Sequence, residues 1–160
     1  MSSETVIGID VSRDWLDGFC LPEKQRFRFQ NSPDGHARLL ETLQSMPDGL
    51  KIGFEATGGQ EWALWRLLIS MGLNAVQLPP AQIKAFALSM GKRAKTDQID
   101  AELIARFMAF RPEAGRTLPD VKLQFLRALT VRRAQMVEAR KRLSAQISAR
   151  RKQGVSAELE

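Results

Sequence analysis

The chain has 160 residues, of which 44% are hydrophobic and 26% are charged, the composition of an ordinary globular protein. Its single cysteine, Cys20, excludes an internal disulfide framework, and we expect a reducing, cytoplasmic location. Its single histidine, His36, excludes a histidine-rich zinc site, so any bound metal ion needs oxygen ligands, which favours Mg²⁺ or Mn²⁺.

The net charge of +6 is unevenly distributed along the chain. Residues 120–152 contain ten lysines and arginines against Asp120 and Glu138, a net charge of +8, whereas the rest of the chain carries −2. A concentrated basic segment indicates a nucleic-acid partner, although most charged runs are simply the solvated face of a helix. No apolar run is long enough to span a membrane, and we expect no membrane association.

Three strands are predicted near the start of the chain, over residues 5–11, 15–21 and 25–30. The first, TVIGIDV, is apolar on both faces and ends in Asp10, an acid that is costly to bury unless it is solvated, paired or bound to metal. Three strands in succession predict an antiparallel meander. Ser32 and Pro33 then begin a helix that runs to about residue 46, with His36 in its first turn as an expected surface residue.

Two further strands alternate with helices. Residues 50–55 form a short strand that ends in Glu55, and residues 73–78 form another. Between them, the glycines of Thr57-Gly58-Gly59 allow a tight turn into an amphipathic helix over about residues 60–71. A short helix over residues 81–90 follows. The order βββαβαβα(α) predicts a mixed α/β sheet in which parallel strands follow the meander.

The stretch at residues 91–107, GKRAKTDQIDAELIARF, combines a basic loop with the acidic start of a helix that ends near residue 110. Asp97 and Asp100 are three positions apart, a spacing that places both carboxylates on one face of a helix. A divalent cation would turn their repulsion into attraction, so the stretch predicts half of a Mg²⁺ site beside a phosphate-binding loop. The alternative is that Asp97 is only a helix cap and Asp100 an ordinary first-turn acid. The basic residues of the loop are Lys92, Arg93 and Lys95.

Residues 113–119 are predicted to be a hinge, because two prolines and a glycine lie between residues 111 and 119. Residues 120–152 lack both residue types and form one long basic helix, and residues 153–160 form a disordered tail. A 3-4-3-4 spacing predicts a coiled-coil seam, imperfect because two positions are arginine: Leu126, Leu129, Arg133, Met136, Arg140, Leu143 and Ile147. The helix residues expected to bind nucleic acid are Arg132, Arg133, Arg140, Lys141 and Arg142.

The acids of the separate segments are predicted to meet. In a βββαβα sheet the first strand is central and the fourth pairs beside it in parallel, so Asp10 and Glu55 would be neighbours at the strand ends. A helix packed across the sheet could bring Asp97 and Asp100 to the same place. Four converging carboxylates repel one another unless they hold metal, and two Mg²⁺ ions about 4 Å apart are a known means of phosphodiester chemistry.

Three motifs give the chain a family resemblance: GIDVS at residues 8–12, FEATGG at residues 54–59 and GKRAKTDQIDAELIARF at residues 91–107. They resemble the N-terminal domain of the DEDD transposases of the insertion sequence 110 family, which includes the pilin-gene invertases. Residues 126–129 and 132–135 also resemble a helical segment of that family, so the resemblance covers nearly the whole chain. The chain departs from the family at Arg13, where lysine is common, and at Gln60, where an aromatic residue is frequent.

The resemblance implies an RNase H-like (RuvC-like) catalytic domain over residues 1–112, a mixed sheet with flanking helices. It assigns Asp10, Glu55, Asp97 and Asp100 as the catalytic acids that bind Mg²⁺ or Mn²⁺. It also implies DNA strand exchange that moves an insertion sequence, with recognition guided by a structured RNA. Family members carry a C-terminal domain with a serine nucleophile, which we expect to be absent from this chain, leaving it inactive alone. We further expect a homo-oligomer formed through the long helix.

Three other functions stay open. A stand-alone junction resolvase or nuclease would use the same acids with a metal-activated water molecule. A nucleotide-binding domain of the sugar-kinase type also opens with a Gly-Ile-Asp strand, but it needs further glycine-rich phosphate loops that this sequence lacks. A non-enzymatic module would bind nucleic acid and dimerise through the basic helix, and its four carboxylates need not converge.

Overall fold

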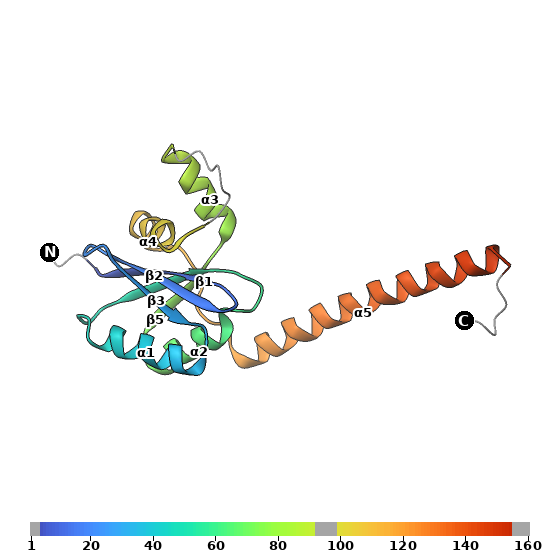
Figure 1. Ribbon diagram of the computed structural model, residues 1–160, viewed down its shortest axis with the longest axis horizontal. Coiled ribbons are helices and arrows are strands. Elements are labelled where there is room, and N and C mark those ends of the chain that lie inside the picture. Colours follow the sequence, from blue (N-terminus) through green and yellow to red (C-terminus); the bar gives the residue numbers. More distant parts are fainter. Residues whose placement is uncertain (1–3, 92–98, 155–160) are drawn as a thin grey trace. The chain divides into compact units, whose positions relative to one another are not determined.

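The computed structural model describes residues 4–91 and 99–154 (Figure 1). In chain order the elements are β1 (Val6–Val11), β2 (Trp15–Leu21), β3 (Gln25–Gln30), α1 (Pro33–Gln44), β4 (Lys51–Glu55), α2 (Trp62–Ser70), β5 (Asn74–Leu78), α3 (Pro80–Ser89), α4 (Ala101–Phe110) and α5 (Val121–Lys152). The contacts divide the chain into two compact units, one up to Leu118 and one from Pro119 onward, and α5 alone makes up the described helix of the second.

The first unit is built on a five-stranded sheet with the strand order β3-β2-β1-β4-β5. β1 is central: it pairs antiparallel with β2 and parallel with β4, and β5 pairs parallel with β4. β2 and β3 complete the predicted antiparallel meander. The mixed sheet and its central first strand confirm the fold class expected from the sequence, an RNase H-like sheet with flanking helices.

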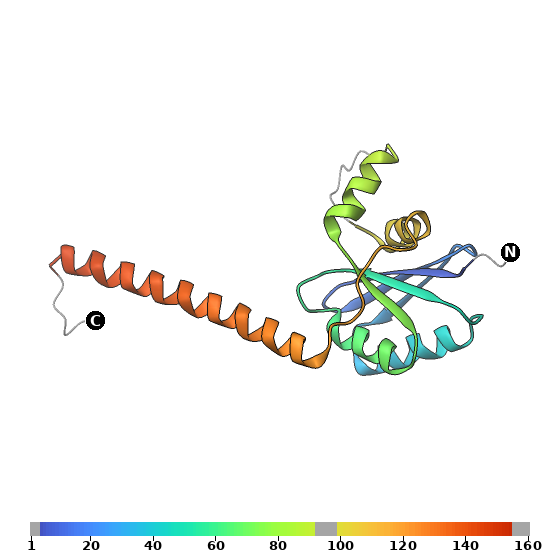
Figure 2. The same ribbon diagram turned by 180° about the vertical axis from the view of Figure 1, so that it is seen from behind.

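Helices cover both faces of this sheet: α1 and α2 lie on one face, and α3 and α4 lie on the other (Figures 1 and 2). The α1/α2 side is filled by a cluster that includes Ile9, Ile52 and the fully buried Trp65. The α3/α4 side is filled by a second cluster that includes Ile104 and Phe107. Apolar side chains project from both faces of the sheet. For this reason β1 and β4 are continuous hydrophobic runs in the sequence.

Two glycines let α4 approach the sheet closely. A Cβ atom built on Gly8 of β1 would lie 2.3 Å from the carbonyl oxygen of Ala101, and one built on Gly53 of β4 would lie 2.3 Å from Sδ of Met108. Neither distance is compatible with a real side chain. The start of α4 therefore lies directly over the centre of the sheet.

The helix starts agree with the sequence in one case and differ in another. The Ser32 hydroxyl caps α1 by accepting from the Gly35 N–H at 3.2 Å, as predicted. Asp100, however, is the N-cap of α4, with an extended backbone and a carboxylate that accepts from the Leu103 N–H at 2.7 Å. The prediction that Asp100 lies inside the helix is wrong, because its backbone is extended and the helix begins only at Ala101. Asp97 and the basic residues Lys92, Arg93 and Lys95 lie outside the described residues.

The segment before α5 is attached to the sheet. Arg116 and Gln77 exchange two backbone hydrogen bonds, of 2.9 and 3.0 Å, so this segment adds a short bridge to β5. The Lys51 ammonium also donates to the carbonyl of Pro112. Whether residues 113–119 act as a hinge stays a prediction.

The predicted long helix is confirmed as α5, with Asp120 as its N-cap and no buried side chain. Its apolar residues Leu126, Leu129, Met136 and Leu143 are all exposed. Its role as a coiled coil stays a prediction. None of the described helices is both long enough and apolar enough to cross a membrane.

Candidate active site

Asp10 and Glu55 lie at the matching ends of two paired parallel strands. The ladder between β1 and β4 runs in register to the pair Ile9–Phe54, and Asp10 and Glu55 are the next residue on each strand. Alternation along a strand puts them on the same face as Gly8 and Gly53, the face covered by α4. Both side chains are half-buried.

Electrostatics link these two acids to the cap of α4. Burial raises the pKa of Asp10, and the nearby carboxylates of Asp17 and Asp100 raise it further. Burial also raises the pKa of Glu55, with added repulsion from Asp10 and Glu61 and an opposing effect of Lys84. Charge repulsion thus links Asp10 to Asp17 and Asp100, and links Glu55 to Asp10.

The described acids do not by themselves form a closed metal site. Among residues 4–91 and 99–154, no three histidine, cysteine, aspartate or glutamate side chains come close enough together to hold one metal ion. One oxygen of Asp100 is occupied by the Leu103 N–H, which leaves its second oxygen available. The fourth predicted acid, Asp97, lies outside the described residues.

A further acid, Asp17, faces the same site and was not predicted. It lies directly opposite Asp10 in the β1–β2 register, and its carboxylate pairs with Arg28 at 3.0 Å. Antiparallel pairing of the first two predicted strands, worked out residue by residue, would have found it.

A buried acid, Glu61, organises the turn after Glu55 and was also missed. It is 1% exposed and accepts hydrogen bonds from the backbone N–H groups of Thr57 and Gly59, at 3.3 and 3.1 Å. It also accepts from the Thr57 hydroxyl and, at 2.7 Å, from the Gln77 side chain. Burial acts to raise the pKa of Glu61, but these hydrogen bonds hold it below the usual value. No sequence pattern marks this residue, because an acid beside a helix start is ordinarily exposed.

Asn31 connects the two loops that follow β1 and β4. Its side-chain amide donates to the carbonyls of Ser12, at 2.8 Å, and Gln60, at 3.3 Å. Its Oδ1 lies 2.7 Å from Nε2 of His36, which is only 8% exposed. The expectation that His36 is a surface residue is therefore wrong: the imidazole is buried to orient Asn31, and burial lowers its pKa.

The basic residues expected to bind nucleic acid divide between two places. Lys92, Arg93 and Lys95 lie outside the described residues, whereas Arg132, Arg133, Arg140, Lys141 and Arg142 are exposed along α5. Three of these arginines line a shallow hollow on α5 together with Leu129, Met136 and Val137.

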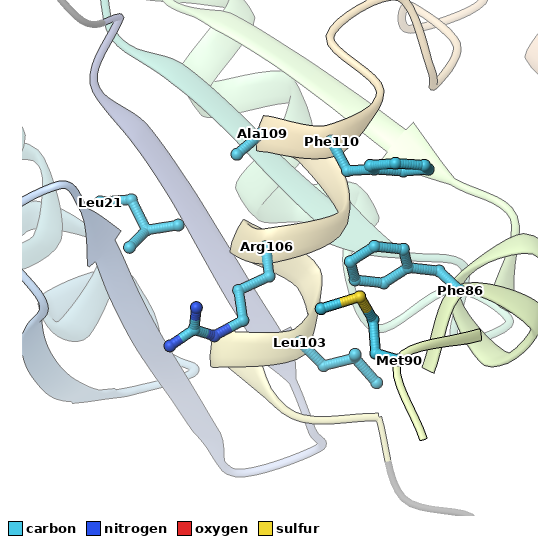
Figure 3. Close-up of a pocket in the computed structure, with 7 residues that line it drawn as sticks. All are labelled: Leu21, Phe86, Met90, Leu103, Arg106, Ala109 and Phe110. Atoms are coloured by element: carbon cyan, nitrogen blue, oxygen red, sulfur yellow. The ribbon is translucent and has the colours of Figure 1, made fainter. Parts of the chain in front are cut away.

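An apolar hollow lies between α3 and α4 (Figure 3). It has a volume of about 260 Å³ and is lined by Leu21, Phe86, Met90, Leu103, Arg106, Ala109 and Phe110. None of Asp10, Glu55 and Asp100 lines it. This hollow is therefore not part of the candidate site at the end of the sheet.

Comparison with known proteins agrees with the family resemblance of the three sequence motifs at residues 8–12, 54–59 and 91–107. The pilin gene-inverting proteins of Moraxella lacunata and Moraxella bovis are each 33% identical to the chain over 112 residues, covering 67% of the chain and 35% of their own length. Two structures of RuvC from Thermus thermophilus have a TM-score of 0.49. One is 19% identical and covers 69% of this chain and 98% of its own. The other, in complex with a Holliday junction substrate, is 18% identical and covers 71% of this chain and 99% of its own.

Residues 7–150 match the family described as Transposase, of the DEDD type of insertion sequence 110. The chain belongs to this family of DEDD transposases.

Proposed function

We propose that the chain is the catalytic domain of a DNA transposase or recombinase that moves an insertion sequence. Asp10, Glu55, Asp97 and Asp100 would hold Mg²⁺ or Mn²⁺ there. The observation that carries the proposal is the in-register ending of β1 and β4 in two half-buried acids beneath α4. Family membership supports the same reaction class.

The described residues fit a divalent cation chemically. Carboxylate oxygens are the ligands that Mg²⁺ and Mn²⁺ prefer. Asp10 and Glu55 repel each other and have raised pKa values, so a cation bound between them would relieve an existing cost. Bound Mg²⁺ would activate and stabilise the oxygens of a phosphodiester during strand exchange.

The residues of the chain would act mainly by fixing oxygen positions. Asp10 and Glu55 are held at the ends of two central strands. The cap hydrogen bond to Leu103 fixes Asp100, and Glu61 fixes the turn that follows Glu55. Ligands held this way need little reorganisation when metal or substrate arrives.

The partners of the site follow from charge and from the family. Exposed arginines of α5 and the basic residues 92, 93 and 95 would neutralise phosphates of DNA or of a structured guide RNA. The apolar residues exposed on α5 would pair with a second copy of the chain. The chain spans about a third of the length of the relatives it matches. The remaining parts of a full-length protein, including a serine nucleophile, would complete the reaction.

The test is a Mn²⁺ titration of the 160-residue chain, followed by electron paramagnetic resonance, with and without branched DNA. Asp10→Asn and Glu55→Gln should each weaken Mn²⁺ binding by roughly tenfold or more, whereas Asp48→Asn, at an exposed turn, should leave it unchanged. If the unsubstituted chain and the three variants bind Mn²⁺ equally well, Asp10 and Glu55 are not metal ligands.

A second measurement separates transposase from nuclease. In a full-length protein, Asp97→Asn should abolish recombination, and the 160-residue chain alone should not cut DNA. Mg²⁺-dependent nicking of branched DNA by this chain alone would instead assign a complete metal-dependent nuclease.

A further inference from the structure

One exposed aromatic side chain lies on the same sheet face as the acids. Trp15 and Asp17 are two residues apart on β2, so both point to the face on which Asp10 lies opposite Asp17. Trp15 is 39% exposed, in contrast to the fully buried Trp65. An exposed indole beside a row of carboxylates is not explained by packing.

An arginine is stacked on this indole. The guanidinium carbon of Arg28, on the edge strand β3, lies 4.6 Å from the centre of the Trp15 ring. Arg28 is opposite Asp17 in the β2–β3 register and pairs with its carboxylate at 3.0 Å. Asp17 thus holds the planar guanidinium over the indole, and the Arg28 side chain is still 58% exposed.

A matched pair on the same two strands differs in its exposure. Arg26 lies over the ring of Phe19 at 4.7 Å, but Phe19 is 3% exposed. The Arg26 guanidinium is paired with Glu102 of α4, which also binds Arg106. The Phe19 ring is therefore closed off under α4, although the Arg26 side chain is 62% exposed, and it is the exposure of the ring that distinguishes the two pairs. The Trp15–Arg28 pair has the same geometry and lies open to solvent.

The surroundings of the open pair suit a nucleotide. A hollow of about 340 Å³ beside it, at the β3 edge of the sheet, is lined by Trp15, Arg28, Phe29 and Gln30 and by three residues of α1, the helix that covers the opposite face: Asp34, Gly35 and Arg38. Strands lie about 4.8 Å apart, so Arg28, two strands from Asp10, is about 10 Å away. The Trp15 indole and the planar guanidinium of Arg28 would stack with a base, and Arg38 would lie near its phosphates.

We propose that Trp15 and Arg28 form a stacking platform for an unpaired nucleobase of the nucleic-acid strand that lies across Asp10 and Glu55. The proposal rests on the proposed function in that its ligand is nucleic acid. It adds a base-binding site that is distinct from Asp10 and Glu55. The backbone of Trp15 is fixed independently of the indole, because its N–H and C=O both bond to the Ser12 hydroxyl, at 3.1 and 3.0 Å. The indole is therefore free to serve binding, and its removal should leave the turn intact.

The test is a binding assay with the 160-residue chain, a short fluorescent single-stranded oligodeoxynucleotide and an abasic strand of equal length, without divalent cations. Trp15→Ala should weaken binding of the normal strand by roughly fivefold to a hundredfold, whereas Trp15→Phe should retain most of it. On the abasic strand, Trp15→Ala should bind as the unsubstituted chain does. Arg28→Ala should weaken binding to the normal strand more than Arg26→Ala does.

Several outcomes would overturn the platform. The first is that the unsubstituted chain does not bind the normal strand. The second is that Trp15→Ala binds the normal strand as tightly as the unsubstituted chain does. The third is that Trp15→Ala loses the same factor of affinity on the normal and the abasic strand. A 2-aminopurine base in the strand should be quenched by the unsubstituted chain and not by Trp15→Ala. The Mn²⁺ titration of Asp10→Asn reports separately on the acids, so failure of the platform and failure of the metal site are distinguishable.

Discussion

The carboxylate of Glu61 accepts a buried hydrogen bond of 2.7 Å from the side chain of Gln77 on β5. The same carboxylate holds the Thr57–Gly59 turn, and the other end of the Gln77 amide, Oε1, accepts from Arg116. A line of hydrogen bonds thus runs from the segment before α5 to the turn beside Glu55.

We predict that Glu61→Gln destabilises the chain by about 1–3 kcal/mol, because an amide cannot accept all the hydrogen bonds that the carboxylate accepts, and buried donors lose partners. Urea unfolding of the two proteins measures the difference. Glu41→Gln, at an exposed position of α1, is the control and should change the free energy of unfolding by less than about 0.5 kcal/mol. Equal effects of the two substitutions would mean that the network contributes nothing.

The pKa of Asp10 predicts a pH dependence of stability. Its folded-state pKa is raised above 3.8, so folding favours the protonated acid. Stability is greatest below the unfolded-state pKa and falls as the pH rises through the folded-state pKa. Asp10→Asn should therefore stabilise the metal-free chain at neutral pH, by on the order of 1 kcal/mol or a Tm increase of roughly 2–4 °C.

Two measurements check the cause. The gain in Tm should disappear below about pH 4, where the carboxyl of the unsubstituted chain is protonated. Mn²⁺ should raise the Tm of the unsubstituted chain more than that of Asp10→Asn. If Asp10→Asn keeps its higher Tm at low pH, the stabilisation does not come from removal of the charge.

Substitutions can separate the capping role of Asp100 from its proposed metal-binding role. Asp100→Ala removes both the cap and the carboxylate, and should cost about 1 kcal/mol of stability and weaken Mn²⁺ binding. Asp100→Ser retains a capping oxygen, so it should keep nearly full stability while losing the same Mn²⁺ binding. If Asp100→Ser binds Mn²⁺ normally, Asp100 is a helix cap and nothing more.

Gly8→Ala should destabilise the chain by about 1–3 kcal/mol, because the new Cβ meets backbone atoms of α4, including the Ala101 carbonyl. Gly53→Ala is the matched comparison. Its Cβ meets the flexible side chain of Met108, which can move aside, so it should cost less. Thermal unfolding measures both, and a larger cost at Gly53 would contradict this account of the α4 contact.

Binding of nucleic acid by α5 should fall steeply as salt concentration rises. Replacing Arg132, Arg133 and Arg140 by Gln should reduce the slope of log K against log salt by roughly 0.7 per lost contact on single strands. The control is replacement of the exposed Gln135 by Ala on the same helix. An unchanged slope would assign α5 to protein contacts.

Sequence alone predicted that Asp10 and Glu55 lie at neighbouring strand ends, because both end strands whose apolar runs indicate parallel neighbours. It misjudged Asp100, since the i,i+3 spacing with Asp97 says nothing about whether the helix has already begun. His36 and Glu61 were misjudged or missed for one reason: burial of a polar side chain depends on partners distant in sequence, here Asn31 and Gln77. Asp17 required the register of a hairpin, which strand prediction alone does not supply.

The position of Asp100 at the N-terminus of α4 has a consequence for the order in which ligands arrive. The N-terminal end of a helix carries a partial positive charge of about half an elementary charge. Asp10 lies near this helix end, so in the proposed metal site the charge would offset part of the repulsion among the ionised acids. The same charge subtracts from the attraction of an incoming cation. A phosphate is attracted by this charge, so a cation and a phosphate that bind together would be opposed less than the cation alone, which favours joint binding of metal and nucleic acid.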